Sequence, residues 1–330
     1  AVTGPGDRVV AERTAQAGVT MADAGHPDLP RDATRNAAGI AAIAVLERAG
    51  AADLGVQITL EKRLPLSGGQ GGSAASAVAG AVAVNRLLGS PLDATALFEC
   101  ALAAESKLSG RHGDNLASAL FGGVILVRSL DPVDIVSLPV PPALRVVLAH
   151  PAQRLSTADA RLVLPRFLER NAAIAQMANV AAMVAAFASG DIALLGRALD
   201  DQIAEPAGAV LLPGVTDAKA AALGAGALAG SISGAGPTSF YITDDDAVAD
   251  AIEALGQQAV AQMPDALAQL PRDEVPLRAF DTVGLPALRA LLGGGEVPLS
   301  APSAAAVASL QAEPLSSLAD ALAPKGHGLV

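Results

Sequence analysis

A glycine-rich turn followed by an apolar run has the clearest chemical meaning in this sequence. Residues 65–85 read PLSGGQGGSAASAVAGAVAVN, in which Ser73 opens a helical Ala/Val stretch. The turn before it holds four glycines, namely Gly68, Gly69, Gly71 and Gly72. Glycines let backbone N–H groups converge where a Cβ would clash, and the first turn of a helix adds unpaired N–H donors and a partial positive charge. The pattern predicts an anion site, with phosphate as its usual occupant. A plain strand-to-helix turn is the alternative.

Two common phosphate loops do not fit this context. The run Gly69-Gln70-Gly71-Gly72-Ser73-Ala74 nominally matches the G-x-G-x-x-A dinucleotide pattern. That pattern opens a βαβ unit and is followed about 20 residues later by an acidic residue after the second strand. Here a second helix, capped by Asp93, follows the first instead. A Walker A loop is excluded as well, because no lysine follows the glycines. We therefore expect a different phosphate cradle.

Oxygen ligands for a metal that accompanies the phosphate are available nearby. The Ser73 hydroxyl stands at the expected helix start, and Glu105 lies among apolar residues near the end of the next helix. Mg²⁺ with a nucleotide prefers a few hard oxygen ligands together with phosphate oxygens. An ordinary exposed glutamate is the alternative for Glu105.

A short polar cluster follows in the next loop. His112, Asp114 and Asn115 stand between glycines and could bind a hydroxyl or an amino group of a substrate. As an alternative, Asp114 could be the N-cap of a helix that starts near Leu116.

The elements that must position these residues form a mixed pattern of strands and helices. Residues 56–60 alternate as a strand and lead into the glycine turn, and residues 7–11 and 18–21 are predicted to pair as a hairpin. Further segments are predicted from periodicity and caps: helices at 36–49, 93–106, 157–171, 171–188, 191–203, 215–223 and 247–263, and strands at 124–127, 145–149 and 239–242. Residues 244–246 are acidic and are expected to cap the helix that follows them.

Composition narrows the class of protein. Hydrophobic residues make up 52% of the 330 residues and charged residues 17%, which allows a sizeable core and excludes global disorder. The net charge of −11 opposes binding to nucleic acid or to an anionic membrane surface. Cys100 is the only cysteine, so we expect a buried thiol, no internal disulfide and a reducing, cytoplasmic setting. The Ala-rich windows 72–88 and 172–195 are interrupted by polar residues and are predicted to be core helices rather than membrane spans.

Three separate stretches resemble one family, the GHMP small-molecule kinases, and within it the homoserine kinases. Residues 65–75 look like the family's P-x-x-x-G-L-G-S-S-A-A nucleotide loop. Residues 105–123 are similar to its pattern of a Glu followed by H-x-D-N-x-A-x-x-x-F-G-G, and residues 230–238 (GSISGAGPT) look like its I-S-G-[AS]-G-P-[TS] loop. The resemblance covers about residues 7–280.

The resemblance implies an α+β fold, in which a nucleotide-binding domain like ribosomal protein S5 (residues 1–142) precedes a ferredoxin-like domain (residues 143–280). Residues 281–330 are left as an Ala/Pro-rich tail of unknown role. It implies transfer of a phosphoryl group from ATP to the side-chain hydroxyl of L-homoserine, with Mg²⁺ as cofactor. A homodimer is compatible with it.

Roles for individual residues follow from the same resemblance. Nucleotide contacts are expected from Asn36 near the adenine, from Gly69, Gly71, Gly72, Ser73 and Ala74 at the phosphates, and from Gly234 and Gly236 in the closing loop. Ser73 and Glu105 are expected to hold Mg²⁺. His112, Asp114 and Asn115 are expected at the substrate, with Asp114 as the proton acceptor. Arg161 is expected to pair with the substrate carboxylate.

Some family features are absent from this sequence. The family's first motif, S-x-N-L-G-P-G-F-D, is missing, and Asp7 is interpreted as part of the strand that follows it. The sequence begins with Ala1, which is compatible with an incomplete start. Gly208 stands where the family usually has an arginine, three positions past the Glu of Glu205-Pro206. Another GHMP kinase, of the mevalonate or shikimate type, and a non-catalytic nucleotide-binding relative are therefore the alternatives.

Overall fold

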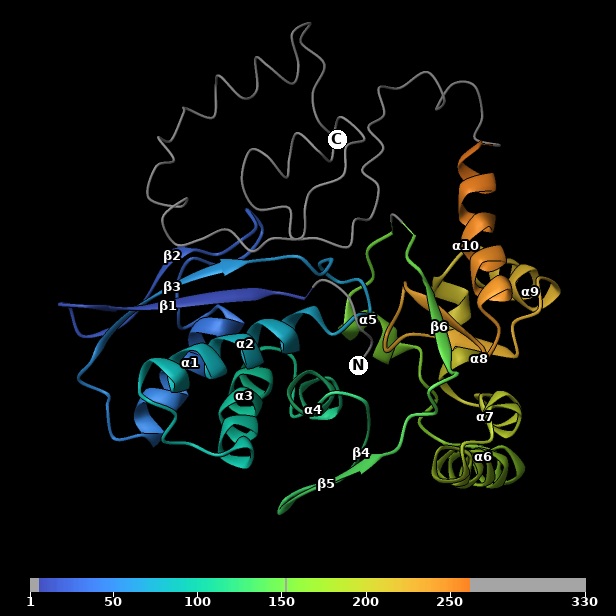
Figure 1. The fold of residues 1–330 in the computed structure, drawn as a ribbon, viewed down its shortest axis with the longest axis horizontal. Helices are drawn as coiled ribbons and strands as arrows, with labels where there is room; N and C mark the ends of the chain where they lie inside the picture. The colour runs from blue at the N-terminus through green and yellow to red at the C-terminus, as the bar shows by residue number, and fades with distance from the viewer. Residues whose placement is uncertain (1–5, 152, 262–330) are drawn as a thin grey trace, which may run out of the picture. The chain divides into compact units, whose positions relative to one another are not determined.

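The computed structural model describes residues 6–151 and 153–261, which form an α+β fold (Figure 1). The elements that carry the nucleotide loop and the core around it come first, in this order: β1 (Arg8–Thr14), β2 (Gly18–Asp23), α1 (Ala37–Arg48), β3 (Gly55–Glu61), α2 (Gly72–Leu87), α3 (Ala94–Leu108), α4 (Asp114–Phe121), β4 (Val124–Leu130) and β5 (Val133–Leu138). The second half holds β6 (Arg145–Ala149), α5 (Thr157–Leu162), α6 (Arg170–Ser189), α7 (Ile192–Ala198), α8 (Ala204–Gly208), the 3₁₀ turn η1 (Ala209–Leu211), α9 (Val215–Gly224), β7 (Ala229–Ile232), β8 (Ser239–Thr243) and α10 (Asp246–Ala261).

The first sheet has the strand order β1-β3-β2, with β3 in the middle. β1 runs antiparallel to β3, with Val10 opposite Thr59, and β2 runs parallel to β3, with Val19 opposite Val56. The predicted hairpin between residues 7–11 and 18–21 is therefore wrong, although both strands exist. The side chains of β3 are more buried than those of either partner, and its apolar residues alternate with polar ones as in a strand that packs one face on a core.

Four helices build the main core against this sheet (Figure 1). The core is assembled largely from small side chains, and the only fully buried aromatic ring in it among the described residues is Phe98. α1 and α2 come very close to each other, because a Cβ placed on Gly80 of α2 would lie 2.5 Å from the carbonyl oxygen of Ala38 in α1. This glycine is therefore required by close helix packing. As expected, Cys100 is buried in this core.

The remaining strands form two further sheets. β4 and β5 make an antiparallel hairpin, of which only the first strand was predicted. β6, β8 and β7 form an antiparallel sheet in that order, with α9 and α10 packed on it through Tyr241, Ala222 and Ile252. The acidic run at 244–246 caps α10 as predicted, since the Asp245 carboxylate accepts a hydrogen bond from the Ala247 N–H at 2.8 Å. The described sheets and the helices between them belong to one compact unit, which extends to Gln258.

The two Ala-rich windows differ in burial. α2 is a core helix, as predicted. α6 is not, because only Ala186 and Phe187 are buried in it, while Ile174 and Met177 are 53% and 64% exposed. In length and apolar composition α6 would qualify as a membrane span, but core helices and signal sequences meet the same criteria, so this is weak evidence. Hydrophobic composition predicted the helix correctly, but composition does not determine which elements pack against it. The predicted tail 281–330 lies outside the described residues.

Candidate active site

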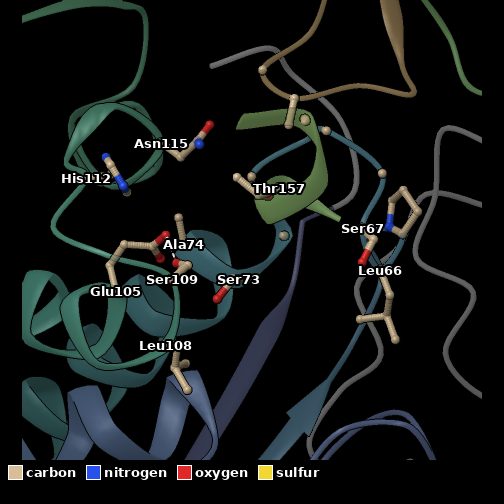
Figure 2. A pocket seen from close by; sticks show the side chains of 18 of the residues that line it. Leu66, Ser67, Ser73, Ala74, Glu105, Leu108, Ser109, His112, Asn115 and Thr157 are labelled. Atoms are coloured by element: carbon tan, nitrogen blue, oxygen red, sulfur yellow. Dashed lines mark hydrogen bonds between the residues drawn. The ribbon is translucent and has the colours of Figure 1, made fainter. Parts of the chain in front are cut away.

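A cavity of about 780 Å³ brings together most of the residues singled out from the sequence. It is lined by Asn36, Gly69, Gly71, Gly72, Ser73, Ala74, Glu105, His112, Asp114, Asn115, Arg161 and Gly234. These residues come from both halves of the chain, and Figure 2 shows several of them from close by. Gly236 does not line the cavity. It packs behind the glycine turn, where a Cβ on Gly69 would lie 2.6 Å from its carbonyl oxygen.

The glycine turn has the backbone expected of an anion site. Gly69 and Gly71 have φ values of +73° and +67°, which L side chains rarely adopt. Gly71 is the N-cap of α2, and no side chain caps this helix end. The first N–H groups of α2, at Gly72, Ser73 and Ala74, therefore stay available for a ligand in the cavity.

The loop at residues 230–238 holds the glycine turn from behind. The Ser233 hydroxyl donates a hydrogen bond to the Gly69 carbonyl at 2.8 Å, and the Thr238 hydroxyl donates to the Gly68 carbonyl. Thr238 is fully buried, and its oxygen also contacts His150 Nδ1 at 2.8 Å and accepts from Gln70 Nε2 at 3.2 Å. The hydroxyl of Thr238 thus joins two motifs that lie far apart in sequence.

A buried ion pair supports the turn from the other side. The Asp7 carboxylate contacts Lys62 Nζ at 2.5 Å and Ser76 Oγ at 2.5 Å, and it accepts hydrogen bonds from the Arg63 and Leu64 N–H groups at 3.0 Å each. Burial alone would raise the pKa of Asp7, but these hydrogen bonds outweigh it and hold the pKa below its ordinary value. Asp7 was predicted only as part of a strand, and neither Lys62 nor Ser76 was singled out. A lysine directly after the strand that enters the turn is the signal that could have indicated them.

Glu105 has a free oxygen directed at the start of α2. Its Oε1 accepts a hydrogen bond from the Ser109 hydroxyl, whereas its Oε2 is buried without a hydrogen-bond partner. Figure 2 shows the carboxylate beside Ser109 and facing Ala74. A buried carboxylate oxygen without a partner is costly, so it fits a bound cation. The described residues hold no group of three His, Cys, Asp or Glu that could bind a metal alone. A cation here would need nucleotide oxygens to complete its shell, which is how Mg²⁺ is usually held.

The predicted substrate residues meet on the far side of the glycine turn. A Cβ on Gly71 would lie 3.0 Å from Asn115 Oδ1, so this amide reaches the turn directly. A Cβ on Gly110 would lie 2.8 Å from His112 Nε2 and 3.7 Å from Arg161 Nη1, so these two side chains are neighbours. Arg161 donates one hydrogen bond to the Ser109 carbonyl at 3.0 Å, which leaves further guanidinium donors for a ligand.

The structure bears on two expectations for individual residues. The alternative that Asp114 caps a helix near Leu116 is wrong, because α4 begins at Asp114 and its N-cap is Gly113. Asn36 lines the cavity, and its amide makes two hydrogen bonds within the chain: Oδ1 accepts from the Ala38 N–H and Nδ2 donates to the Pro30 carbonyl, each at 3.0 Å. It therefore caps α1, and the second amide hydrogen is left for the expected contact with adenine, which stays a prediction.

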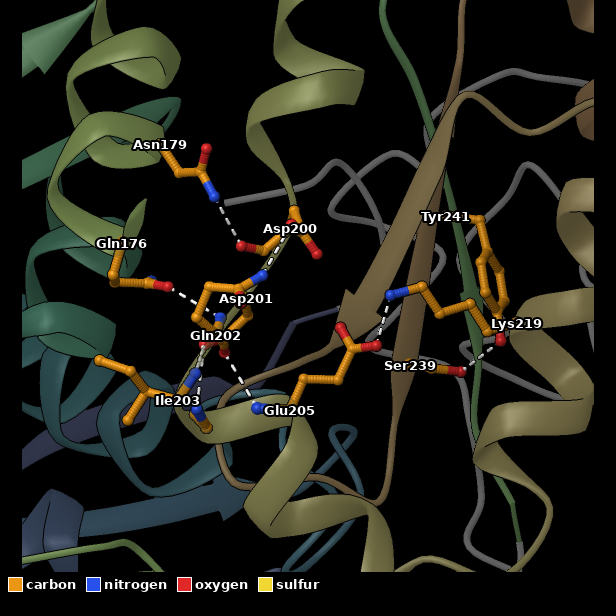
Figure 3. Close-up of polar contacts among 11 residues, drawn as sticks. Gln176, Asn179, Asp200, Asp201, Gln202, Ile203, Glu205, Lys219, Ser239 and Tyr241 are labelled. Carbon is orange, nitrogen blue, oxygen red and sulfur yellow. Dashed lines mark hydrogen bonds and ion pairs between the residues drawn. The ribbon is translucent and has the colours of Figure 1, made fainter. Parts of the chain in front are cut away.

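α8 forms one wall of the cavity and is held by a polar network that the sequence did not reveal (Figure 3). The Asp201 carboxylate accepts hydrogen bonds from the N–H groups of Ile203, Ala204 and Glu205 at 2.8–3.1 Å. The Glu205 side chain pairs with Lys219, and its second oxygen is buried without a partner. These contacts fix the helix that carries Gly208 into the cavity.

Comparison with known proteins identifies matching families and structures. The profile of the GHMP kinases N-terminal domain matches residues 36–123, and that of the GHMP kinases C-terminal domain matches residues 183–261. A homoserine kinase of Chloroherpeton thalassium is 41% identical over 264 residues, covering 76% of this chain and 83% of that protein. A homoserine kinase of Arabidopsis thaliana is 39% identical over 254 residues, covering 74% and 69%.

Solved structures give the same result at the level of the fold. The crystal structure of homoserine kinase from Cytophaga hutchinsonii matches with a TM-score of 0.75 and 40% identity, covering 78% of this chain and 83% of that chain. L. major mevalonate kinase in complex with R-mevalonate matches with a TM-score of 0.59 at 18% identity, covering 79% and 83%. The second likeness concerns the fold alone.

Proposed function

Because this chain belongs to the GHMP kinase family, we propose that it transfers the γ-phosphoryl group of ATP to the side-chain hydroxyl of L-homoserine. The products are ADP and O-phospho-L-homoserine, a step toward threonine. One observation carries the proposal: the free N-terminus of α2 and the unpartnered Oε2 of Glu105 line the same cavity as His112, Asn115 and Arg161. The relatives at about 40% identity support homoserine as the acceptor.

The glycine turn and Glu105 would bind the nucleotide and its metal ion. In our proposal the N–H groups at Gly72, Ser73 and Ala74 bind phosphate oxygens, with Gly69 and Gly71 giving the backbone its shape. Ser73 and Glu105 would hold Mg²⁺, which neutralises charge on the phosphates when it is bound. Gly234, whose Cβ would lie 3.4 Å from the Gly69 carbonyl oxygen, forms the opposite wall. Phosphoryl transfer depends mainly on such positioning and charge neutralisation.

Four residues near the start of α4 would bind and deprotonate the acceptor, homoserine. Arg161 would bind the homoserine carboxylate, and His112 and Asn115 would orient the amino acid beside the glycine turn. The bond from the hydroxyl oxygen to Pγ forms as the bond from Pγ to the bridging oxygen of ADP breaks. Asp114 would accept the hydroxyl proton. Its carboxylate makes no hydrogen bond to any other described residue and lines the cavity, so it is available for this role.

The broader organisation belongs to the same proposal. We keep the division into domains 1–142 and 143–280, because β4 and β5 pack against the core of the first four helices, whereas β6 pairs with β8 of the second half. Residues 262–280 and the tail 281–330 lie outside the described residues. A cytoplasmic location is proposed from the biosynthetic reaction.

A homodimer is proposed as well, supported by the exposed apolar residues Ile174, Met177 and Val180 on α6. Light scattering coupled to size-exclusion chromatography measures the assembly directly.

The test of the activity is ADP release with Mg·ATP and a panel of acceptors. We expect turnover with L-homoserine and background rates with mevalonate and shikimate. O-phospho-L-homoserine should be detected by mass spectrometry in amounts equal to the ADP released. Turnover with mevalonate or shikimate would show that the chain is a GHMP kinase with another substrate. Binding of ATP without turnover of any acceptor would identify a non-catalytic relative, and either result would overturn the proposal.

A further inference from the structure

The glycine turn contains no cation of its own, yet an ammonium lies against it. Lys62 Nζ donates a hydrogen bond to the carbonyl of Gly72, the first residue of α2, at 3.0 Å. A Cβ on Gly72 would lie 2.9 Å from this nitrogen, so the absence of a side chain at Gly72 leaves room for the lysine. Among the described cations that line the cavity, Lys62 alone donates a hydrogen bond to the backbone of the turn.

We propose that Lys62 contacts the terminal phosphates of the bound nucleotide, and that Asp7 is the positioning residue that holds the ammonium there. This inference rests on the proposed function, because it assumes a nucleotide in the cavity. An ammonium has three N–H donors. Asp7 and the Gly72 carbonyl accept two of them, and Lys62 lines the cavity, so the third donor is left for a ligand at the start of α2.

The surroundings of Asp7 explain how the ammonium is kept in place. The side chains of Asp7 and Lys62 are 0% and 4% exposed. Such a pair is stable only when its remaining hydrogen-bonding groups are satisfied. Two backbone N–H groups, from Arg63 and Leu64, fix one carboxylate oxygen, and Ser76 of α2 binds the other. Asp7 thereby connects the end of β3, the entry to the turn and the first turns of α2.

The charges of the pair support a function beyond packing. Burial lowers the pKa of Lys62, and the Asp7 carboxylate opposes this change. Replacing such a pair with apolar side chains is often neutral or stabilising, so stability alone does not account for a charged pair at this place. Binding of a phosphate accounts for the charged pair, because the Lys62 ammonium can donate a charge-assisted hydrogen bond to a phosphate oxygen.

Titration calorimetry with ATP, ADP and adenosine tests the role of Lys62. We expect Lys62→Met to weaken the binding of ATP and ADP about 10–100-fold, as for a lost hydrogen bond between charged groups. The dissociation constant of adenosine should stay within twofold. Because Lys62→Met leaves Asp7 buried and unpaired, the double variant Asp7→Asn/Lys62→Met is measured beside it as a neutral pair. Arg63→Met is the matched control, because it removes the adjacent positive charge that pairs with Glu61. It should leave the affinities for ATP and ADP, each relative to that for adenosine, unchanged.

Steady-state kinetics test the positioning role of Asp7. Asp7→Asn should raise KM for ATP about tenfold or more, while KM for homoserine stays within twofold; a merely structural role would affect both. Ser76→Ala, which removes the hydroxyl contacts to Asp7 and to the Gly72 carbonyl but no charge, should have a smaller effect in the same direction. Equal losses of adenosine and ADP affinity in Lys62→Met, or no loss at all, would overturn this inference alone. Failure of the unaltered protein to bind ATP would instead contradict the proposed function.

Discussion

The hydroxyl of Thr238 donates its hydrogen to the carbonyl oxygen of Gly68, although the two residues stand 170 positions apart in the chain. A hydroxyl has one hydrogen to donate, so the His150 ring nitrogen at 2.8 Å must donate to Thr238 in turn. This places the proton of a neutral His150 on Nδ1. The glycine turn is therefore held in shape by a side chain from the second half of the chain.

Replacing Thr238 should show what this contact contributes. Thr238→Val keeps the shape but removes the hydroxyl that contacts His150 Nδ1 and Gln70 Nε2, and it leaves the Gly68 carbonyl with only the Thr238 N–H at 3.3 Å. We therefore expect a loss of about 1–3 kcal/mol in the free energy of unfolding and weaker ATP binding. Thr238→Ser keeps the hydroxyl and should retain most of both. Denaturant unfolding and ATP titration of the two variants provide the comparison; equal behaviour of Val and Ser would show that the hydroxyl is not used.

The metal assignment predicts a specific kinetic change. Glu105→Gln removes the charge of the free oxygen at constant size. The Mg²⁺ concentration for half-maximal rate should therefore rise more than the roughly 10–100-fold that follows the loss of a group hydrogen-bonded to a metal ligand. Ser73→Ala should act in the same direction. Ser109→Ala removes only the hydrogen bond to Oε1 and is the control, for which a smaller rise is expected. An unchanged Mg²⁺ dependence in Glu105→Gln would refute the assignment.

Gly208 offers a gain-of-function test on the acceptor side. Its φ and ψ of −75° and −28° suit any residue, and a Cβ there would lie 3.3 Å from the flexible end of Ile232. We therefore expect Gly208→Arg to fold and to add a second guanidinium for the homoserine carboxylate. A charge-assisted hydrogen bond contributes about 1.5–3 kcal/mol, so KM for homoserine should fall about 10–100-fold. Gly208→Ala should leave KM unchanged, and an unchanged KM in the arginine variant would show that its guanidinium does not reach the carboxylate.

Acid stability should depend on Asp7. Because the pKa of this carboxyl group in the folded chain lies below its ordinary value of 3.8, its stabilising effect is complete above about that pH. The effect is lost as the pH falls from there through the folded value. We expect Asp7→Asn to have a lower melting temperature than the unaltered protein at neutral pH, and the difference to shrink below pH 3.8. A difference that stays constant down to pH 2 would contradict the assignment; melting curves by circular dichroism measure it.

Features that depend on contiguous residues could be predicted from the sequence. Each of these features lies within a short run of residues: the glycine turn with its strand and helix, Glu105, and the loop at 230–238. Their order along the chain indicated the family. Helix periodicity and caps likewise located most elements.

Which distant residues meet depends on how the whole chain packs. Strand pairing around β3 replaced the expected hairpin, since the central strand is chosen by burial and not by proximity in sequence. Asp7 meets Lys62 across 55 positions, and Thr238 meets Gly68 across 170. Such contacts are selected by packing and by the need to satisfy buried polar groups, and no local pattern records them. The same reason gave Asn36 a capping role and left α6 largely exposed.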